Sequence, residues 1–402
     1  MKSRFADRMA RRMDRVQPSA IRDLLRLGDD PGIISFGGGY PDASLFPAEQ
    51  LSAIIQTSLA ESKGASLQYT ASNGLPRLRA QIAERMTRDG VPCGAEDVLI
   101  LQGGQQGLDL TAKMLIEPGD VIVTENPTFL GALIAFNPCE PRYAPVPMDQ
   151  DGMDMDALEQ TLKANPGAKL LYTVPDFQNP TGVTLSLARR KRLIELANKF
   201  DLIVLEDTPY RELRYAGEAI PPIKSLDTEG RVIYLGSFSK ILAPGLRLGW
   251  AVAAPELLEK LGLLKVAADT QCGTLSMHAA SAYLDQHDID AHIATIRETY
   301  RRKKNLMLDC IRSSFPQDIH FTDPEGGMFT WLTFPEGFDA TAFMQDFALP
   351  DAKVAYVPGA TFFPVREEPN HARVSYPGQT DERIVEGMTR LGELLKRKAS
   401  SL

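Results

Sequence analysis

Apolar runs of strand length alternate with helical segments through the middle of the chain, and this alternation most constrains the fold. The apolar runs lie at 98–101, 121–125, 169–175, 202–207, 232–236 and 249–254. Continuous apolar runs of this length, bounded by turn residues, indicate strands that are buried on both faces. Strands that alternate with helices indicate a mostly parallel sheet with helices packed against it. The sequence therefore predicts an α/β domain.

The chain changes character after Pro255. Helical patterns run to about Ser313, with an apolar stripe that includes Ile289, Ile293 and Ile296. Three short strand patterns, at 326–334, 353–359 and 371–378, precede a final helix at 381–398. Because 402 residues are about right for two domains, we predict a second, smaller α+β domain in this part.

Charge and cysteine content exclude several classes of protein. The formal net charge of −8 argues against a nucleic acid or an anionic membrane as the main partner. One basic run, Arg189–Arg192, lies on an amphipathic helix and is expected to face solvent. The four cysteines form no CxxC pair and no cluster with histidine, so we expect reduced thiols and no metal site. With no secretory signal and no apolar run of roughly 18–20 residues, we expect a cytoplasmic protein.

The segment Arg231–Trp250, RVIYLGSFSKILAPGLRLGW, places several polar groups directly after a predicted strand. Ser237, Ser239 and Arg247 have the hydroxyl and guanidinium groups that hold a phosphate. Lys240, if partly desolvated beside them, would have a lowered pKa and could form an imine with an aldehyde. Each residue alone also fits a turn, a solvated lysine or a surface ion pair. The combination is more specific, since ligand groups gather at strand ends in open α/β sheets.

Three other predicted strands also end in groups that suit a ligand. Phe129 follows one strand, where its ring could stack on a flat heterocycle or pack in the core. The strand at 202–207 ends in two acids, and a buried Asp207 would need a partner, either a protonated pyridine nitrogen or a nearby arginine. Asn179 lies in a turn after a third strand, and its amide could point back into a site.

Glycine-rich turns add two candidate ligand contacts. Gly103–Gly104 leads into a helix near Gln105, and free N–H groups at a helix N-terminus form an anion site. The turn has neither the Walker A pattern nor GxGxxG, so neither a P-loop nor a dinucleotide is expected. Gly37–Gly39 would let the backbone approach a ligand closely. Taken alone, Tyr69 is expected to pack against other side chains. Arg22 lies on a predicted helix that begins near Ser19, and taken alone its side chain is expected to face solvent.

Together these segments resemble the fold type I enzymes that use pyridoxal 5'-phosphate (PLP), in the aspartate aminotransferase superfamily. The likeness spans essentially the whole chain and is carried by IRDLLRL, SFGGGYPDASLFP, LQYTASNG, GGQQGLDL, FQNPTG, EDTPYREL, GSFSKILAPGLRLGW, GGMFTW and RVSYPG. It is greatest to the broad-specificity subgroup that includes 2-aminoadipate and kynurenine aminotransferases. The resemblance implies a large domain, 48–288, with a mostly parallel seven-stranded sheet between helices. It also implies a small α+β domain, 289–402, which residues 1–47 join on the substrate side.

The resemblance implies PLP as the cofactor and gives three residues catalytic roles. Lys240 would form the imine and carry the proton, Asp207 would pair with the pyridine nitrogen, and Tyr210 would bind the phenolic oxygen together with Asn179. Phe129 would stack on the ring. The implied phosphate contacts are the N–H groups of Gly104 and Gln105, the side chains of Ser237, Ser239 and Arg247, and Tyr69 of a second subunit. The active site would thus be shared within a homodimer.

The resemblance also implies substrate contacts. Arg373 would grip the α-carboxylate, with Asn179 beside it, and Arg22 is a candidate for a second, distal carboxylate. Gly39 and Tyr40 would line the substrate side. Two positions depart from the pattern: Gly104 stands where relatives often have serine or alanine, and Tyr40 where they often have leucine. The larger Tyr40 would alter the substrate pocket.

The implied activity is transfer of the amino group of an L-amino acid to 2-oxoglutarate by a ping-pong mechanism. The donor would be 2-aminoadipate or an aromatic, branched or aliphatic amino acid. A cysteine-conjugate β-lyase, a decarboxylase or a racemase would use the same Lys240 and Asp207, so the motifs leave these open. Transcription regulators with an aminotransferase-like module need a winged-helix domain, and only about thirty residues precede the glycine run. A nicotinamide-dependent dehydrogenase would need a fingerprint that is missing.

Overall fold

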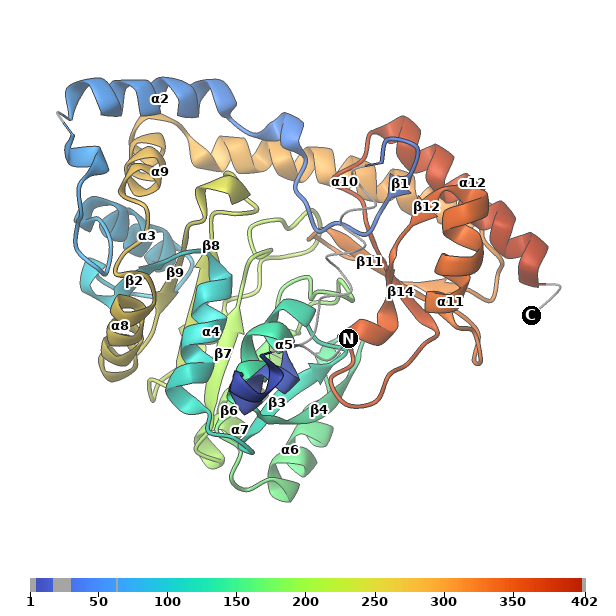
Figure 1. The fold of residues 1–402 in the computed structure, drawn as a ribbon, viewed down its shortest axis with the longest axis horizontal. Coiled ribbons are helices and arrows are strands. Elements are labelled where there is room, and N and C mark those ends of the chain that lie inside the picture. Colours follow the sequence, from blue (N-terminus) through green and yellow to red (C-terminus); the bar gives the residue numbers. More distant parts are fainter. Residues whose placement is uncertain (1–4, 17–29, 63, 400–402) are drawn as a thin grey trace.

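A large mixed sheet organises the first two thirds of the molecule, in a computed structural model that describes residues 5–16, 30–62 and 64–399 (Figure 1). Its strands, in the order in which they pair, are β2 (Val98–Leu101), β9 (Gly249–Val252), β8 (Val232–Ser237), β7 (Ile203–Asp207), β6 (Leu170–Thr173), β3 (Val121–Asn126), β4 (Arg142–Asp149) and β5 (Gly152–Met153). Strands β8, β7, β6, β3 and β4 pair in parallel, and β9 runs antiparallel to both of its neighbours. The predicted mostly parallel sheet is confirmed, with the two-residue β5 added to seven strands at one edge.

Strand β4 is not among the six apolar runs that predicted the strands of this sheet. Pro145 and Pro147 lie inside β4, where they pair in parallel with β3. A proline has no N–H to donate, so it is tolerated in a strand that has an open side. Among the residues that the structure describes, the sheet continues beyond β4 only with the two-residue β5, which explains why β4 can carry prolines.

Helices cover both faces of the sheet. In this part of the chain they are α2 (Ala48–Glu61), α3 (Pro76–Arg88), α4 (Gly104–Leu115), α5 (Leu130–Phe136), α6 (Met155–Ala164), α7 (Leu187–Lys199), α8 (Pro255–Asp269) and α9 (Thr274–Gln286). Short 3-10 helices are η1 (Ala6–Arg8), η2 (Arg11–Arg15), η3 (Ala43–Leu45), η4 (Ala65–Leu67), η5 (Ala95–Asp97), η6 (Asn137–Cys139), η7 (Ile223–Leu226) and η8 (Pro244–Leu246). The helix expected near Ser19 and its Arg22 lie outside the described residues.

Alternate residues of each strand pack against different helices, as the two-residue period of a strand requires. Tyr172 and Leu205 belong to the larger core cluster, which includes residues of α4 and α5. Leu171 and Val204 belong to a second cluster, with residues of α6 and α7. We refer below to the α4 face and the α7 face of the sheet.

One expectation for α7 is wrong. The basic run Arg189–Arg192 was expected to face solvent, but the Arg190 side chain is fully buried. Its guanidinium pairs with the buried carboxylate of Asp176 at 2.7 Å and donates to the carbonyl oxygens of Pro175 and Leu185. A buried charge persists when it is paired and hydrogen-bonded in this way.

The C-terminal part is a smaller α+β assembly beside the large sheet (Figure 1). Its elements are α10 (Ile289–Ser314), β10 (His320–Phe321), β11 (Phe329–Thr333), α11 (Ala340–Phe343), the π-helix η9 (Met344–Ala352), β12 (Val354–Ala355), β13 (Val357–Pro358), η10 (Gly359–Phe362), β14 (His371–Ser375) and α12 (Asp381–Ala399). Four strands form a sheet in the order β10-β11-β14-β13, and β12 pairs in parallel with β1 (Ile34–Ser35). The β1 segment thus lies against C-terminal elements, whereas η2 contacts η6 of the large-sheet part, where Arg11 pairs with Glu140 at 3.2 Å. The boundaries at 47 and 288 stay a prediction.

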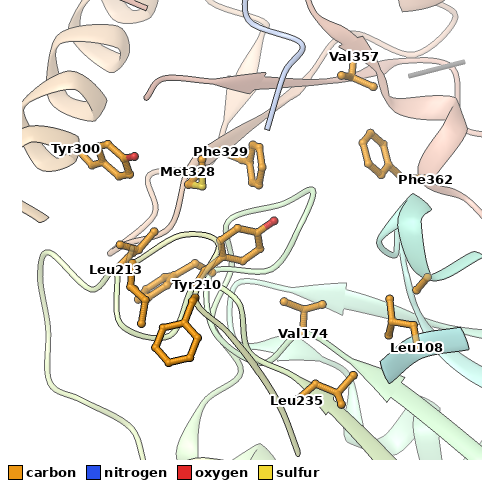
Figure 2. Packing of buried hydrophobic residues seen from close by; sticks show 14 of the residues in the cluster. Leu108, Val174, Tyr210, Leu213, Leu235, Tyr300, Met328, Phe329, Val357 and Phe362 are labelled. Carbon is orange, nitrogen blue, oxygen red and sulfur yellow. The ribbon is translucent and has the colours of Figure 1, made fainter. Parts of the chain in front are cut away.

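The two parts face each other across buried aromatic and aliphatic side chains. Figure 2 shows Phe329 and Phe362 of the C-terminal part opposite Tyr210, Val174 and Leu108, which come from the loops and the helix at the end of the large sheet. The rings of Tyr210 and Phe329 meet edge to face, with centroids 5.6 Å apart. This contact brings the C-terminal part to the carboxyl ends of the parallel strands. Over the described ranges, no helix is long and apolar enough to cross a bilayer.

Candidate active site

A cavity of about 330 Å³ lies where the carboxyl ends of the parallel strands meet the C-terminal part. Of the residues that the sequence analysis singled out, it is lined by Gly39, Tyr40, Gly104, Gln105, Phe129, Asn179, Asp207, Tyr210, Ser237, Ser239, Lys240, Arg247 and Arg373. This is the edge at which open α/β sheets bind ligands. The structure therefore brings into one cavity all but two of the residues proposed from sequence, Tyr69 and Arg22.

Asp207 ends β7 on the α4 face, and its surroundings answer the question of its partner. Its Oδ2 accepts a hydrogen bond of 2.9 Å from the hydroxyl of Tyr172, on the neighbouring strand β6. Burial raises the pKa of Asp207 to about 6, and the Tyr172 hydrogen bond opposes that rise. No arginine of the described residues pairs with it. Asp207 thus remains available to a cationic group in the cavity.

Lys240 lies three residues after the end of β8 and lines the cavity. Its Nζ donates a hydrogen bond of 2.8 Å to the carbonyl oxygen of Gly39, from the glycine run near the N-terminus. Burial, and then the nearby charges of Arg373 and Arg247, lower the pKa of Lys240 to about 8. An amine with such a pKa is partly unprotonated near neutral pH and can act as a nucleophile.

Arg373 reaches the cavity from β14 and joins three segments that are far apart in sequence. Its Nη1 donates to Asn179 Oδ1 at 2.8 Å, and its Nη2 donates to the carbonyl oxygen of Gly37 at 2.7 Å. Asn179 Nδ2 in turn donates to the hydroxyl of Tyr210 at 3.1 Å. The guanidinium lies over the ring of Phe329, 4.3 Å from its centroid. These contacts fix the orientation of Arg373.

The Nε of Arg373 is buried and has no hydrogen-bond partner among the described residues. Burial lowers the pKa of Arg373 to about 10, so the group stays charged at neutral pH. Because Arg373 lines the cavity, its charged guanidinium is available to a carboxylate bound there.

A cradle of donors surrounds the N-terminus of α4. The helix begins at Gly104, so the first N–H groups of the helix, at Gly104 and Gln105, are free for a ligand. Arg247 lies beside this turn, where its Nη2 donates to the carbonyl oxygen of Gln102 at 3.4 Å. Gly103 has φ of 75° and ψ of 171°, a backbone conformation that is essentially confined to glycine, and a Cβ there would also stand 2.6 Å from that Nη2.

Two hydroxyls and a ring complete the wall of the cavity. Ser237 and Ser239 line it after β8, with the Ser239 N–H donating to Ser237 Oγ at 3.1 Å. Phe129 lines it at the start of α5, which answers the question of whether this ring lies in the core or at the site. Tyr40 lies at the rim, where 56% of its surface is exposed.

Tyr69 does not reach the cavity of its own chain. It lies in the loop between η4 and α3, and 81% of its surface is exposed. An exposed aromatic ring of this kind is available to another molecule. Arg22 lies outside the described residues, so its position relative to the cavity stays a prediction.

Three groups of the site were not predicted from sequence: the Tyr172 hydroxyl, the Phe329 ring and the Gly37 carbonyl. Tyr172 pairs in register with Leu205, which is two residues before Asp207 and therefore on the same face. That relation follows only once the order of the strands is known. Phe329 lies in the segment GGMFTW, which was noted as a motif, but nothing in the sequence indicates that its ring supports Arg373.

The donor set fits PLP. An anion cradle at the N-terminus of α4 suits the phosphate, Lys240 suits the aldehyde, and the carboxylate of Asp207 suits a protonated ring nitrogen. The guanidinium of Arg373 in the cavity wall adds a place for a carboxylate. Within the ranges that the structure describes, no three His, Cys, Asp or Glu side chains are placed to hold a metal ion.

Comparison with known proteins agrees with this interpretation. The model of the family "Aminotransferase class I and II" matches residues 34–391. An aromatic-amino-acid aminotransferase of Thermococcus litoralis is 43% identical over 388 residues, which make up 95% of this chain and 93% of that protein. A 2-aminoadipate transaminase of Thermus thermophilus is 40% identical over 385 residues, or 95% of each chain.

A solved structure is similar over almost the whole fold. The kynurenine aminotransferase of Pyrococcus horikoshii, crystallised in complex with PMP, superposes with a TM-score of 0.93 at 38% identity. The match covers 98% of this chain and 99% of that one.

Proposed function

Because the chain belongs to the class I and II aminotransferases and uses PLP, we propose that it transfers the amino group of an aromatic, 2-aminoadipate or aliphatic L-amino acid to 2-oxoglutarate by a ping-pong mechanism. The observation that carries this proposal is that Lys240, Asp207 and Arg373 meet in one cavity, although they come from separate elements. The activities of the similar proteins support the choice of donors. The walls supplied by Leu108, Val174 and Phe329 suit an apolar side chain.

In this proposal the cofactor is held at three points. The N–H groups of Gly104 and Gln105, with the side chains of Ser237, Ser239 and Arg247, bind the phosphate. Asp207 binds the ring nitrogen, and Phe129 lies against the ring. Asn179 and Tyr210, which hydrogen-bond each other at 3.1 Å, bind the phenolic oxygen.

Bound PLP supplies an aldehyde that takes up the amino group and a ring that accepts the electron pair left when the Cα–H bond breaks. Lys240 Nζ removes the proton from Cα of the donor and later gives it up, and a pKa of about 8 suits both steps near neutral pH. Asp207 stays largely ionised at neutral pH, since its pKa is about 6. Its charge keeps the ring nitrogen protonated and stabilises the negative charge that develops during the reaction.

Arg373 binds the α-carboxylate of donor and acceptor. Its guanidinium is planar and is already oriented by Asn179, the Gly37 carbonyl and the Phe329 ring, so binding costs little further ordering. We assign the distal carboxylate of 2-aminoadipate and 2-oxoglutarate to Arg22. Tyr40 at the rim limits the shape of the donor side chain.

We further propose a cytoplasmic homodimer in which Tyr69 of one subunit binds the cofactor phosphate of the other. The exposure of the Tyr69 ring supports this assignment. The proposed division is a small domain of residues 1–47 and 289–402 and a large domain of residues 48–288. The pairing of β1 with β12 supports the placement of the residues shortly ahead of α2 in the small domain.

The test is single-turnover conversion of the bound cofactor by one donor at a time, followed by its absorbance. We expect 2-aminoadipate, kynurenine, leucine and aromatic donors alone to convert the cofactor to its pyridoxamine form, and 2-oxoglutarate alone to restore it. Pyruvate and ammonia from a cysteine conjugate, without accumulation of the pyridoxamine form, would instead indicate β-lyase chemistry and overturn the proposal.

The same assay tests the role of Arg22. We expect Arg22→Ala to slow conversion by 2-aminoadipate and by 2-oxoglutarate while leaving leucine unaffected. Arg26→Ala, four residues on, is the matched control. Equal weakening of dicarboxylic and neutral substrates would refute the assignment.

A further inference from the structure

The loop that carries Tyr69 is held on both sides of this residue by one pair of side chains. The N–H of Thr70 donates to Gln271 Oε1 at 2.5 Å, and Thr274 Oγ1 donates to the carbonyl oxygen of Gln68 at 2.8 Å. Gln271 Nε2 donates to Thr274 Oγ1 at 2.8 Å, which joins the two contacts. Gln271 and Thr274 lie at the junction of α8 and α9, about two hundred residues away in sequence. The backbone around an exposed ring is therefore anchored from a distant part of the chain.

Packing within one chain does not account for this anchoring. Exposed loop residues are commonly the mobile part of a domain, and holding them in place costs conformational entropy. Burial of the Tyr69 ring offsets little of this entropy cost, because 81% of the residue's surface remains exposed. Thr270, next to Gln271, has φ of 65°, a strained conformation for a β-branched residue. Fixing the backbone around an exposed ring lowers the stability of the single chain, which indicates that the ring contacts another molecule.

The α8–α9 junction is also tied to the phosphate cradle of its own chain. Lys265 on α8 is fully buried and pairs with Asp269 at 2.8 Å. Gln106 of α4 donates to Asp269 Oδ2 at 2.8 Å and accepts a hydrogen bond of 2.9 Å from the N–H of Gln102. The carbonyl of Gln102 is the group that accepts from Arg247. Helix α8 thus supports the turn where a phosphate would bind and ends at the residues that hold the Tyr69 loop.

We propose that Gln271 and Thr274 are positioning residues that present Tyr69 to the cofactor phosphate of a second copy of this chain. They act by fixing the backbone on either side of Tyr69 before the subunits meet, which removes the ordering cost from cofactor binding. This inference rests on the proposed homodimer with a shared site.

The experiment is a double-mutant cycle on the full-length protein, with the dissociation constant for PLP measured by titration of the apoenzyme. We expect Tyr69→Phe to weaken PLP binding roughly tenfold or more, since it removes a hydrogen bond to a charged group. Gln271→Ala should weaken it about two- to tenfold by releasing the loop. In the Tyr69→Phe background, Gln271→Ala should add less than about a factor of two, because both changes act through one contact.

Two further variants separate positioning from general loosening. Thr274→Val keeps the shape of the side chain and removes its hydroxyl, so it should weaken PLP binding in the same direction as Gln271→Ala. Gln81→Ala is the matched control, because Gln81 of α3 also donates to a backbone carbonyl on α9, that of Ser281, at 3.0 Å, while its side-chain hydrogen bonds within the described residues go to Ser281 and Asp285 and not to residues 68–70. It should lower the melting temperature and leave PLP affinity unchanged.

The outcomes distinguish this inference from the proposed function. If Tyr69→Phe leaves PLP affinity unchanged, the cross-subunit role of Tyr69 fails. Suppose that Tyr69→Phe weakens PLP binding. The positioning role alone is then overturned if Gln271→Ala leaves PLP affinity unchanged, or if Gln271→Ala weakens binding by the same factor with and without Tyr69→Phe. Sedimentation should show Gln271→Ala to be as dimeric as the unmodified protein, and a monomeric variant would mean that the pair maintains the interface instead.

Discussion

Glu206 and Asp207 are neighbours at the end of β7, yet they face opposite sides of the large sheet and have different surroundings. Glu206 lies on the α7 face, where its carboxylate accepts hydrogen bonds from the N–H groups of Ile223 at 2.7 Å and Lys224 at 2.8 Å. Asp207 lies on the α4 face at the cavity, where, among the described residues, Tyr172 alone donates to its side chain.

The difference shows that burial does not by itself mark a functional acid. Burial raises the pKa of both groups, Glu206 to about 7 and Asp207 to about 6. Glu206 anchors the start of η7 and has a backbone donor for each oxygen, so its role is structural. Asp207 keeps hydrogen-bonding capacity that faces the cavity, and a cationic group of a ligand can use it. The contrast predicts that changes on the α4 face alter the reaction, whereas changes on the α7 face alter stability.

The largest effect is expected for Lys240→Ala. Loss of the group that moves the proton should lower turnover by at least about 10³-fold, and PLP should no longer be retained after borohydride reduction and denaturation. The melting temperature of the apoenzyme should change little, because the side chain of Lys240 makes one hydrogen bond within the described part of the chain, to Gly39. Lys191→Ala, at an exposed position on α7 of the opposite face, is the control and should retain full activity. Turnover that survives in Lys240→Ala would refute the assignment.

Asp207→Asn should have the next largest effect. The amide still accepts the Tyr172 hydrogen bond but carries no charge to hold a proton on the ring nitrogen, so turnover should fall about 10²- to 10³-fold. PLP affinity should fall as well, and apoenzyme stability at neutral pH should not fall, because a buried charge is removed. Steady-state kinetics measures the loss of turnover, and urea unfolding of the apoenzyme measures its stability. A stable, fully active Asp207→Asn variant would contradict the distinction between the two acids.

Glu206→Gln tests the α7 face with a matched change. The amide turns one acceptor into a donor that faces a backbone N–H of η7, which should lower the free energy of unfolding by about 1–3 kcal/mol. Turnover should stay within about threefold of the unmodified enzyme, since η7 does not line the cavity. Chemical denaturation and kinetics at saturating substrate measure the two effects. A loss of turnover as large as that of Asp207→Asn would remove the contrast.

The pH dependence of apoenzyme stability should reveal Asp207. Its pKa is raised in the folded state from 3.8 to about 6, so the folded protein binds this proton more tightly than the unfolded chain. Stability should therefore fall as pH rises from about 4 to about 6, by on the order of 2 kcal/mol from this group. Glu125 and Glu206, both with pKa values raised to about 7, contribute in the same direction. Asp207→Asn should flatten the curve between pH 4 and 6, and an unchanged curve would show that Asp207 is not buried as a charge.

The smallest effect is expected for Tyr172→Phe. Without the hydroxyl, the charged form of Asp207 loses its hydrogen bond, so the apoenzyme should lose about 1–2 kcal/mol above pH 6 and less below pH 4, where Asp207 is protonated. Glu125 and Tyr210 also interact electrostatically with Asp207, and neither is altered by this change. Tyr356→Phe is the control, since the buried Tyr356 hydroxyl donates to the neutral carbonyl of Ala340 at 2.7 Å. The loss of stability in Tyr356→Phe should not depend on pH in this range.

Most of the large sheet and its strand-end groups could be predicted because the relevant patterns are local. Each of the six apolar runs became a strand. Ser237 and Lys240 could be placed because they lie at or just after the end of β8, and Asn179 because it lies in the turn after β6. The two clear misses are also local in origin. The prolines of β4 argued against a strand that is in fact present near the edge of the sheet. The charge of Arg190 predicted an exposed side chain, but this side chain is buried in an ion pair with Asp176.

The contacts that join distant segments could not be derived from the order of residues. Tyr172 and Asp207 are 35 residues apart, Thr70 and Gln271 are 201 apart, and Gly37 and Arg373 are 336 apart. Periodicity tells which side of a strand a residue faces relative to its neighbours, but the register between strands depends on how side chains pack in three dimensions. For that reason the linear pattern indicated which groups this enzyme has at its strand ends, and the folded chain determined which of them meet.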